Sequence, residues 1–317
     1  MKILNKKIPL VFALAFLFIF SAIVYSVGYK MAMDKFNNIV SYNNEKHKMY
    51  SLLSDVDYNI RNDFVGEIDE NKLLEQICVG YANGVDSQNC KFFTNKDYEE
   101  YNKSQIYRKV SINDSQINDV GYIRIDNFCS TSSSVFKETL NKLMSDGIKK
   151  LVIDVRNCDH GDYSEAMNVL KFLINDKEIV STINKKGEKD VVCSSDIDLG
   201  VRVAVIVNEK TSGPAELLAS AFKDKEDSVV IGSKTKGSAV REKAVIISED
   251  FVLVFPDAYY VTKSGNIILN SGVEPNENVK LSDENDKLFI NHALDFQTEE
   301  LLMKAVNYIN DKRCIKC

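Results

Sequence analysis

Three polar turns hold most of the residues that could do chemistry in this chain, and each follows an apolar, β-branched run. The first closes the segment LVIDVRNCDHG (151–161), the second lies in VAVIVNEKTSGPAELLASAFKD (203–224) and the third in VVIGSKTKGSAV (229–240). Pro214 suits the first position of a helix, which predicts Gly213 as the N-cap. Such a strand–turn–helix corner directs backbone N–H groups and the positive end of a helix dipole outward, where enzymes often hold a nucleophile.

Metal and thiol chemistry have weaker support. The three histidines are far apart, and Cys314 and Cys317 form a single CxxC pair with no second pair nearby, so we expect no metal site and no cofactor. Cys158 and His160 are too close together in one loop to act as nucleophile and base. The segment 232–237 lacks the glycine spacing of a phosphate-binding loop.

In their order along the chain, the three turns resemble motifs of the C-terminal processing peptidases, or tail-specific proteases, which use a Ser–Lys dyad on a crotonase-like (ClpP-like) core. The family motifs are L-V-[IL]-D-[LV]-R-N-N-x-G-G, V-N-x-x-[TS]-A-S-A-S-E and G-x-x-T-x-G-K-G-x-x-Q. The matching positions are Leu151, Val152, Ile153, Asp154, Val155, Arg156, Asn157, Gly161, Val207, Asn208, Thr211, Glu216, Gly232, Thr235 and Gly237. The likeness covers roughly residues 55–310.

The same alignment of motifs shows where the chain departs from the family pattern. The position of the nucleophilic serine holds Gly213, that of the general-base lysine holds Ser238, and that of the assisting glutamine holds Glu242. A glycine has no side chain to attack a carbonyl, and a hydroxyl cannot replace an amine as proton acceptor. Because losing both members of a nucleophile–base pair abolishes most of such activity, we expect a pseudoprotease that binds a peptide or protein partner without cutting it.

An active serine peptidase with a shifted dyad is the alternative hypothesis. Ser212 adjoins the lost serine position and Lys236 lies two residues before the lost lysine, so a small rearrangement would bring hydroxyl and amine together. In either case, the resemblance implies that a bound peptide would contact Asn157, His160, Gly161 and Gly237.

Other polar residues of the motifs are expected to be structural. Asp154 and Arg156 form a strand-end pair that holds the loop, and Glu216 anchors the helix after the corner. The family usually carries a PDZ module between its N-terminal helices and its core. Residues 102–120 are too few for one, so we expect the usual reader of substrate tails to be absent.

The N-terminus contains an uncharged apolar run, IPLVFALAFLFIFSAIVYSVG (8–28), whose helix would span roughly 31 Å, the thickness of a bilayer core. Lys2, Lys6 and Lys7 precede it, which favours a cytoplasmic N-terminus. A cleaved signal peptide is the alternative, but the exit at 24–29 is a poor cleavage site. We therefore expect a single-pass protein of the cell membrane with its domain outside the cytoplasm.

From residue 119 onward strands alternate with helices, which predicts an α/β domain with a mostly parallel sheet and crossover connections. The expected strands are 122–125, 151–155, 201–207, 229–231, 244–247 and 252–255. The expected helices are 69–83, 135–148, 167–174 and 286–310. Around 84–110 the chain is polar and is expected to form a loop.

The whole chain has 317 residues, of which 40 are Lys or Arg and 46 are Asp or Glu, for a net charge of −6. This balance gives no basic excess for a phosphate backbone, so we expect no nucleic-acid partner. The expected organisation is a cytoplasmic tip and transmembrane signal anchor (1–30), a helical stalk (31–60), an N-terminal helical segment (61–117), a peptidase-like core (118–310) and a Cys-containing tail (311–317).

Overall fold

The computed structural model describes residues 10–106, 110–159, 161–197, 199–280 and 299–311. The chain divides into two compact units, Met1–Glu70 and Asn71–Cys317. The predictions for His160, for the first part of the expected last helix, and for Cys314 and Cys317 lie outside the described residues.

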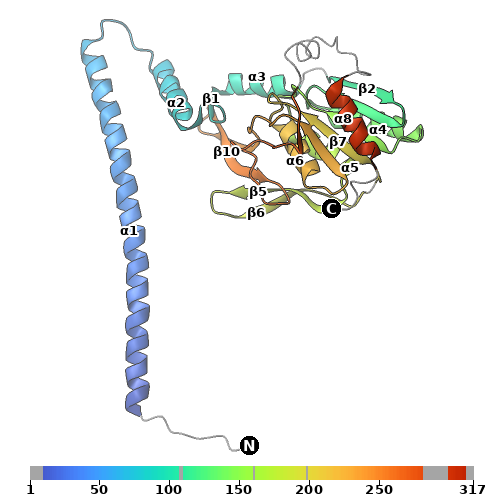
Figure 1. Cartoon of the computed structure of the whole chain (residues 1–317). Coiled ribbons are helices and arrows are strands. Elements are labelled where there is room, and N and C mark those ends of the chain that lie inside the picture. Colours follow the sequence, from blue (N-terminus) through green and yellow to red (C-terminus); the bar gives the residue numbers. More distant parts are fainter. Residues whose placement is uncertain (1–9, 107–109, 160, 198, 281–298, 312–317) are drawn as a thin grey trace, which may run out of the picture. The chain divides into compact units, whose positions relative to one another are not determined.

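The first unit consists almost entirely of α1, a helix from Leu10 to Asp63 (Figure 1). Its sequence contains no proline and only one glycine, Gly28, so no residue strongly opposes the helix. The stretch Leu14–Asn37 is long and apolar enough to cross a membrane, by length and composition. From Leu10 onward, the expected apolar span and the expected stalk are therefore parts of one continuous helix.

The second unit contains a six-stranded sheet in the order β11-β8-β7-β4-β3-β2. Its strands are β2 (Ile112–Ile117), β3 (Val120–Ile125), β4 (Lys150–Asp154), β7 (Arg202–Val207), β8 (Ser228–Gly232) and β11 (Glu277–Asn278). All neighbouring pairs in this order are parallel except β3 and β2, which are antiparallel. The strands β3, β4, β7 and β8 have continuous apolar sequences because both of their faces are buried.

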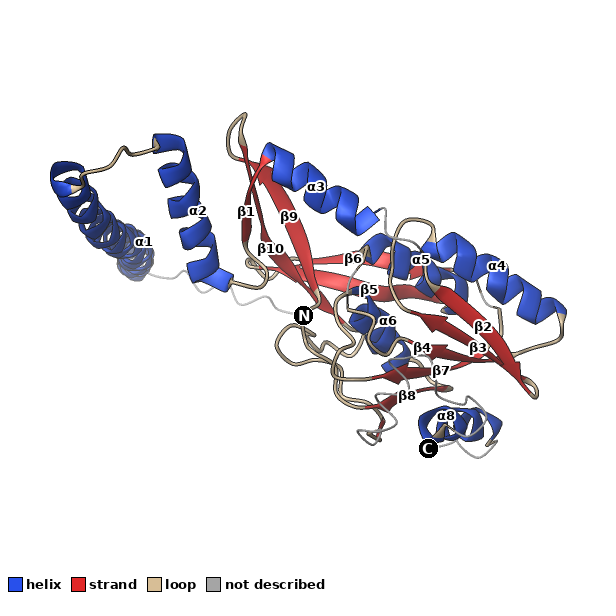
Figure 2. Cartoon of the chain, turned by 90° about the horizontal axis from the view of Figure 1, so that it is seen from above, coloured by secondary structure: helices blue, strands red, loops and turns tan. Residues whose placement is uncertain are grey.

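Helices cover both faces of this sheet (Figure 2). The helices that follow α1 are α2 (Glu70–Asp86), α3 (Asn95–Ile106), α4 (Ser132–Ser145), α5 (Tyr163–Leu173), α6 (Pro214–Lys223) and α8 (Glu300–Asn310). On one face, Ile153 and Val205 pack in a cluster with α4, α5 and α6. On the other, Val152 and Ile206 pack with α8. Because successive side chains along a strand point to opposite faces of the sheet, β4 and β7 each contribute apolar residues to both clusters.

A second sheet was not expected from the sequence. It contains β1 (Lys91–Thr94), β5 (Asp176–Asn184), β6 (Lys189–Ser195), β9 (Val240–Ile246) and β10 (Phe251–Val261), and all of its pairings are antiparallel. The prediction of a mostly parallel sheet therefore describes only the first sheet, and the unit as a whole has mixed sheets. The expected strands at 244–247 and 252–255 belong to the β9–β10 hairpin.

The expectation of a loop around 84–110 was wrong. This segment contains the end of α2, the strand β1 and the helix α3. The strand is only four residues long, and α3 carries polar or charged residues at most positions, so neither shows apolar periodicity. The strand is held by pairing with β10, which lies far along the chain.

Candidate functional site

The corner between β7 and α6 has the backbone shape of a nucleophile position. Gly213 is the N-cap of α6, with φ 59° and ψ −120°, and Pro214 is the first helical residue, which confirms the sequence prediction. These dihedral angles are open to glycine and strained for other residues, and strained strand-to-helix turns hold the nucleophile of some hydrolases. A β-carbon added at Gly213 would lie 3.5 Å from Oη of Tyr163, so a side chain has room there.

The two positions that the family motifs assign to the dyad are in contact. The backbone N–H of Gly213 donates a hydrogen bond of 3.1 Å to Oγ of Ser238. Oγ of Ser238 in turn donates to Oε2 of Glu216, at 3.1 Å. The hydroxyl of Ser238 therefore has a partner on each side, and it occupies the position that the motifs assign to the lysine amine.

The buried carboxylate of Glu216 joins the second and third turns. Its Oε2 accepts hydrogen bonds from the backbone N–H groups of Gly213 (3.0 Å) and Ser238 (2.8 Å) and from the Ser238 hydroxyl. Its Oε1 accepts from the Thr235 hydroxyl (2.6 Å) and from the N–H of Gly237. Since a carboxylate offers roughly four lone-pair sites, these donors leave none for a substrate proton. The expected anchoring role of Glu216 is what the contacts show.

The alternative pair, Ser212 and Lys236, is not joined in this structure. The hydroxyl of Ser212 donates to the backbone carbonyl of Asp159, at 2.8 Å. The backbone N–H of Lys236 donates to the carbonyl of Thr211 (3.1 Å), so the two turns adjoin, but the Lys236 side chain is exposed. Within the described part of the chain no hydrogen bond links the Ser212 hydroxyl to the Lys236 ammonium.

The expected peptide contacts of the first turn have partners within the protein. The N–H of Asn157 donates to Oδ1 of Asn208 (3.0 Å), and the amide of Asn208 donates back to Oδ1 of Asn157 (2.9 Å). Gly161, with φ 137°, lies so close to Phe128 that a β-carbon would be 2.2 Å from the Phe128 carbonyl oxygen. These contacts fix the first turn against the corner.

Gly237, the expected contact of the third turn, is equally constrained. Its N–H is bound by the Glu216 carboxylate, and its φ is 83°. A β-carbon at Gly237 would lie 2.8 Å from the backbone nitrogen of Gly272. The glycine is therefore required by close packing of two backbone segments.

Tyr163 belongs to the site, although no sequence motif singled it out. Its Oη faces the space that a side chain at Gly213 would enter, and it accepts a hydrogen bond of 3.2 Å from the N–H of Val240, the first residue of β9. Its ring stacks on Tyr260, with centroids 5.0 Å apart. Burial raises the pKa of Tyr163, and it raises the pKa of Tyr260 to about 12, so both phenols are neutral near pH 7.

Glu242, at the assisting position, forms an ion pair with Lys91 of β1, at 3.2 Å. Lys91 also donates to the hydroxyl of Tyr101, at 2.9 Å. Burial opposes the charge on Lys91, but the hydrogen bond to Tyr101 and the Glu242 carboxylate raise its pKa overall. The carboxylate of Glu242 is thus paired with the ammonium group of Lys91 in the second sheet.

A buried ion-pair network lies behind the first turn. The guanidinium of Arg156 donates to Asp154 (3.0 Å) and to Glu299 (2.8 Å), and Tyr122 donates to Asp154 (2.8 Å). Arg156 and Glu299 side chains are each 1% exposed. Burial alone would lower the pKa of Arg156, but the two carboxylates raise it and keep the guanidinium charged. The network joins the end of β4 to the start of α8, as a structural pair would.

Neither metal nor thiol chemistry gains support at the site. Among the residues that the structure describes, no three or more His, Cys, Asp or Glu side chains are grouped so as to hold a metal ion. Cys158 is fully buried, and burial raises its pKa well above the usual value. Its thiol therefore stays protonated and packs in the core.

Comparison with known families decides where this site belongs. Residues 119–279, just over half of the chain, match peptidase family S41. The chain belongs to this family. The matched residues include the three turns, and so the S41 pattern extends over the corner at Gly213 and its partner Ser238.

Two relatives show the extent of the likeness to S41 proteins. The chloroplastic C-terminal processing peptidase of Tetradesmus obliquus is 28% identical over 158 residues, or 49% of this chain and 34% of that protein. A probable CtpA-like serine protease of Staphylococcus saprophyticus is 27% identical over 166 residues, or 51% of this chain and 34% of that protein. This chain thus spans about a third of the length of these relatives.

Solved structures share the fold. A lipoprotein of Streptococcus agalactiae gives a TM-score of 0.55 at 15% identity, covering 72% of this chain and 84% of that one. The photosystem II D1 C-terminal processing protease gives a TM-score of 0.50 at 24% identity, covering 55% and 48%. At these identities the likeness shows the S41 fold alone.

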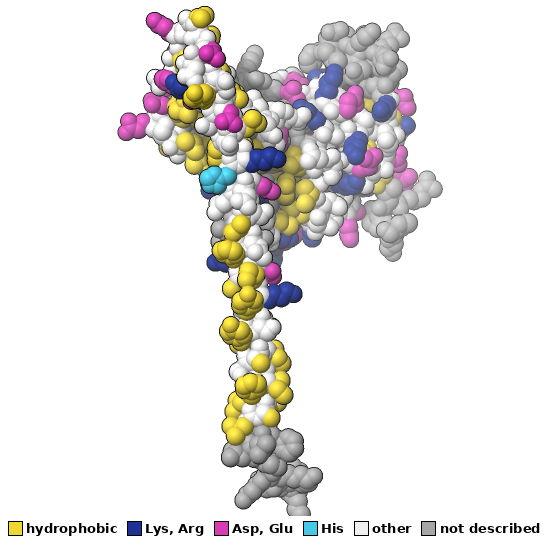
Figure 3. Space-filling view, turned by 90° about the vertical axis from the view of Figure 1, so that its left-hand side faces the viewer, with side chains coloured by type: hydrophobic (Ala, Val, Ile, Leu, Met, Phe, Trp, Pro, Cys, Tyr) yellow, Lys and Arg dark blue, Asp and Glu magenta, His cyan; other side chains and the backbone are white. Residues whose placement is uncertain are grey.

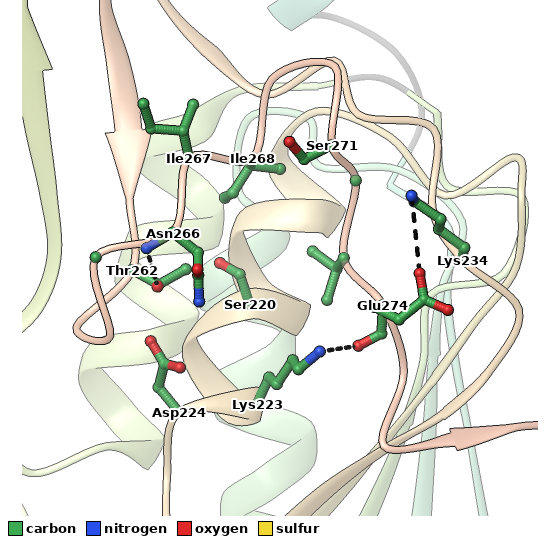
Figure 4. Close-up of a pocket in the computed structure, with 13 residues that line it drawn as sticks. Ser220, Lys223, Asp224, Lys234, Thr262, Asn266, Ile267, Ile268, Ser271 and Glu274 are labelled. Atoms are coloured by element: carbon green, nitrogen blue, oxygen red, sulfur yellow. Dashed lines mark hydrogen bonds and ion pairs between the residues drawn. The ribbon is translucent and has the colours of Figure 1, made fainter.

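A cavity of about 480 Å³, lined by both polar and apolar residues, lies near the C-terminal end of α6 (Figure 4). It is lined by Lys223 and Asp224 at the C-terminal end of the helix and by Glu274. Lys223 donates to the backbone carbonyl of Glu274, and Lys234 forms an ion pair of 3.8 Å with the Glu274 carboxylate. Gly213, at the N-terminal end of α6, does not line this cavity.

Proposed function

We propose that this chain is a non-cleaving member of family S41 that binds an extended peptide or protein segment and is held at the cell membrane by α1. The observation that carries the proposal is the contact between Gly213 and Ser238, in a corner whose turns are held together by buried hydrogen bonds. Gly213 has no hydroxyl and Ser238 has no amine, so neither position carries the group that a Ser–Lys dyad needs there. The turns around them are nevertheless held in place by the buried Glu216 carboxylate and by the hydrogen bonds between Asn157 and Asn208.

The edge of the second sheet offers a place for the peptide. Among the described strands β9 pairs only with β10, so its other edge is free, and it begins at Val240, two residues beyond Ser238. A free strand edge presents N–H and C=O groups that can pair with an extended segment. The N–H of Val240 is bound by Tyr163, so pairing would use the residues that follow it.

A peptide-binding experiment tests the proposal. The purified full chain in detergent would be mixed with a fluorescent, unstructured peptide, and anisotropy and the intact mass of the peptide would be measured together. We expect anisotropy to rise while the peptide mass stays unchanged over hours. Cleavage that a serine-directed inhibitor blocks would overturn the proposal, and an unchanged anisotropy with a panel of unstructured peptides would overturn its binding half.

Membrane attachment is a separate part of the proposal. It is supported by the apolar stretch Leu14–Asn37 of α1 and by the lysines that precede it. The second unit, which contains the expected peptidase-like core, would then lie outside the cytoplasm. Alkaline extraction and protease accessibility of intact cells would test both points. Release of the chain by alkali, or protection of the second unit in intact cells, would contradict them.

A further inference from the structure

The part of α1 beyond its apolar stretch carries a second, narrower apolar face. In the space-filling view hydrophobic side chains cover much of the end of α1 nearest the N-terminus, and farther along they alternate with charged ones (Figure 3). On this farther part Met49, Leu53, Val56 and Ile60 are between 38% and 47% exposed. Charged residues such as Lys48, Asp55 and Arg61 share the same turns, so this part of the helix is outside any hydrocarbon layer.

The spacing of these four residues is that of a coiled-coil seam. The steps from 49 to 53, 56 and 60 alternate between four and three residues, which places Leu53 and Ile60 at a positions and Met49 and Val56 at d positions. The sequence continues the same spacing backward with Lys46, Tyr42 and Ile39. In the sequence the pattern therefore extends over about three heptads, the shortest length that indicates a coiled coil.

We infer that two copies of this chain pair in parallel through this α1 seam, defined by Met49, Leu53, Val56 and Ile60. A second copy is the occupant that the pattern itself favours, because identical seams are complementary when they run in register. The inference rests on the helix alone and is independent of what the S41 site does.

Charge at the seam supports the parallel register. Lys46 is the polar residue among the a positions, and Glu45, at the preceding g position, flanks the hole into which an a residue of a parallel partner packs. In register, Lys46 of each copy lies beside Glu45 of the other, giving two pairs of opposite charge. A single polar a position of this kind specifies register at some cost in stability.

The test is the mass of the full chain in detergent micelles, measured by light scattering with the detergent contribution removed. We expect the mass of two copies. The double variant Leu53→Glu, Ile60→Glu should have the mass of one copy. Its matched control, Ser51→Glu, Tyr58→Glu, adds the same charges with the same spacing about 200° around the helix and should keep two. Helicity measured by circular dichroism should be equal in both variants.

Register is tested by charge exchange and by cross-linking. Lys46→Glu should weaken pairing, and adding Glu45→Lys should restore it.

Cross-linking gives a second test of the seam. Met49→Cys should give a disulfide-linked pair on oxidation, well above the background of the native cysteines, whereas Ser51→Cys should not. A single-copy mass for the parent chain, or a two-copy mass for the Leu53→Glu, Ile60→Glu variant, would overturn the inference. Cross-linking through Ser51→Cys equal to that through Met49→Cys would overturn the seam.

Discussion

Gly213 and Ser238, which are 25 positions apart in the sequence, are joined by a hydrogen bond of 3.1 Å from the backbone N–H of one to the side-chain oxygen of the other. The corner of this S41 chain thus brings together the two positions that the family motifs assign to a nucleophile and its base. What occupies them is a hydrogen atom and a hydroxyl. The surrounding contacts through Glu216 keep the corner in shape without that chemistry.

The first prediction concerns Glu216. Glu216→Gln replaces one acceptor oxygen by an NH₂ group that faces donors, so the free energy of unfolding should fall by about 3 kcal/mol. Urea denaturation followed by circular dichroism would measure it. The control Glu274→Gln, at a side chain that is 57% exposed, should change stability by less than about 1 kcal/mol. Equal effects of the two substitutions would contradict the anchoring role.

The second prediction separates two adjacent glutamates at the start of α8. Glu299→Gln removes a buried charge partner of Arg156 and should lower the free energy of unfolding by about 3–5 kcal/mol. Glu300→Gln removes only an exposed pair with Lys304 and should cost less than about 1 kcal/mol. Thermal or denaturant unfolding of both variants would show the difference. A stable Glu299→Gln protein would mean that α8 does not depend on this network.

The third prediction uses opposite effects at two glycines. Gly213→Ala should destabilise the protein by about 1–3 kcal/mol, because φ of 59° with ψ of −120° is strained for alanine although its β-carbon has room. Gly80→Ala, at an open position inside α2, should stabilise it by roughly 0.5–1 kcal/mol. Denaturant midpoints would measure both. A neutral Gly213→Ala would show that the corner relaxes to another conformation.

The fourth prediction is a pH dependence. Burial raises the pKa of the Cys193 thiol to about 11, from 9.0. Above pH 9 the unfolded chain loses this proton while the native chain keeps it, so stability falls as pH rises from 9 to 11, by about 1.4 kcal/mol per pH unit from this group. Cys193→Ala should reduce the slope of unfolding free energy against pH by that amount. An unchanged slope would show that the thiol ionises freely in the native state.

The parts of the fold that could be predicted are those whose local sequence is sufficient to specify a strand or a helix. The strands β3, β4, β7 and β8 have continuous apolar runs, and Pro214 after Gly213 marks the start of α6. In the second sheet, parts of β9 and β10 were predicted, but β1, β5 and β6 were not, because they mix polar with apolar residues and β1 is only four residues long. Such strands are specified by their partners across the sheet.

Some residues of the site could also be predicted from the sequence, and others could not. Motif spacing alone placed Gly213 opposite Ser238, because each lies at a fixed distance from a recognisable turn. Tyr163 could not be found this way, since its hydroxyl reaches the corner only because the first residue of α5 lies beside the first residue of β9. The expected contacts of Asn157 and Gly237 lie in the right turns, but their polar groups bind Asn208 and Glu216, which only the three-dimensional arrangement reveals.

The shifted pair of Ser212 and Lys236 would, if active, leave a chemical trace. The most direct measurement is to incubate the full chain with a fluorophosphonate probe and to determine its intact mass, with Gly213→Ser, Ser238→Lys as the restored comparison. We predict no mass increase on the parent chain, even after long incubation. A stoichiometric adduct on the parent chain, mapped by fragmentation to Ser212 or to any other hydroxyl of the corner, would contradict it.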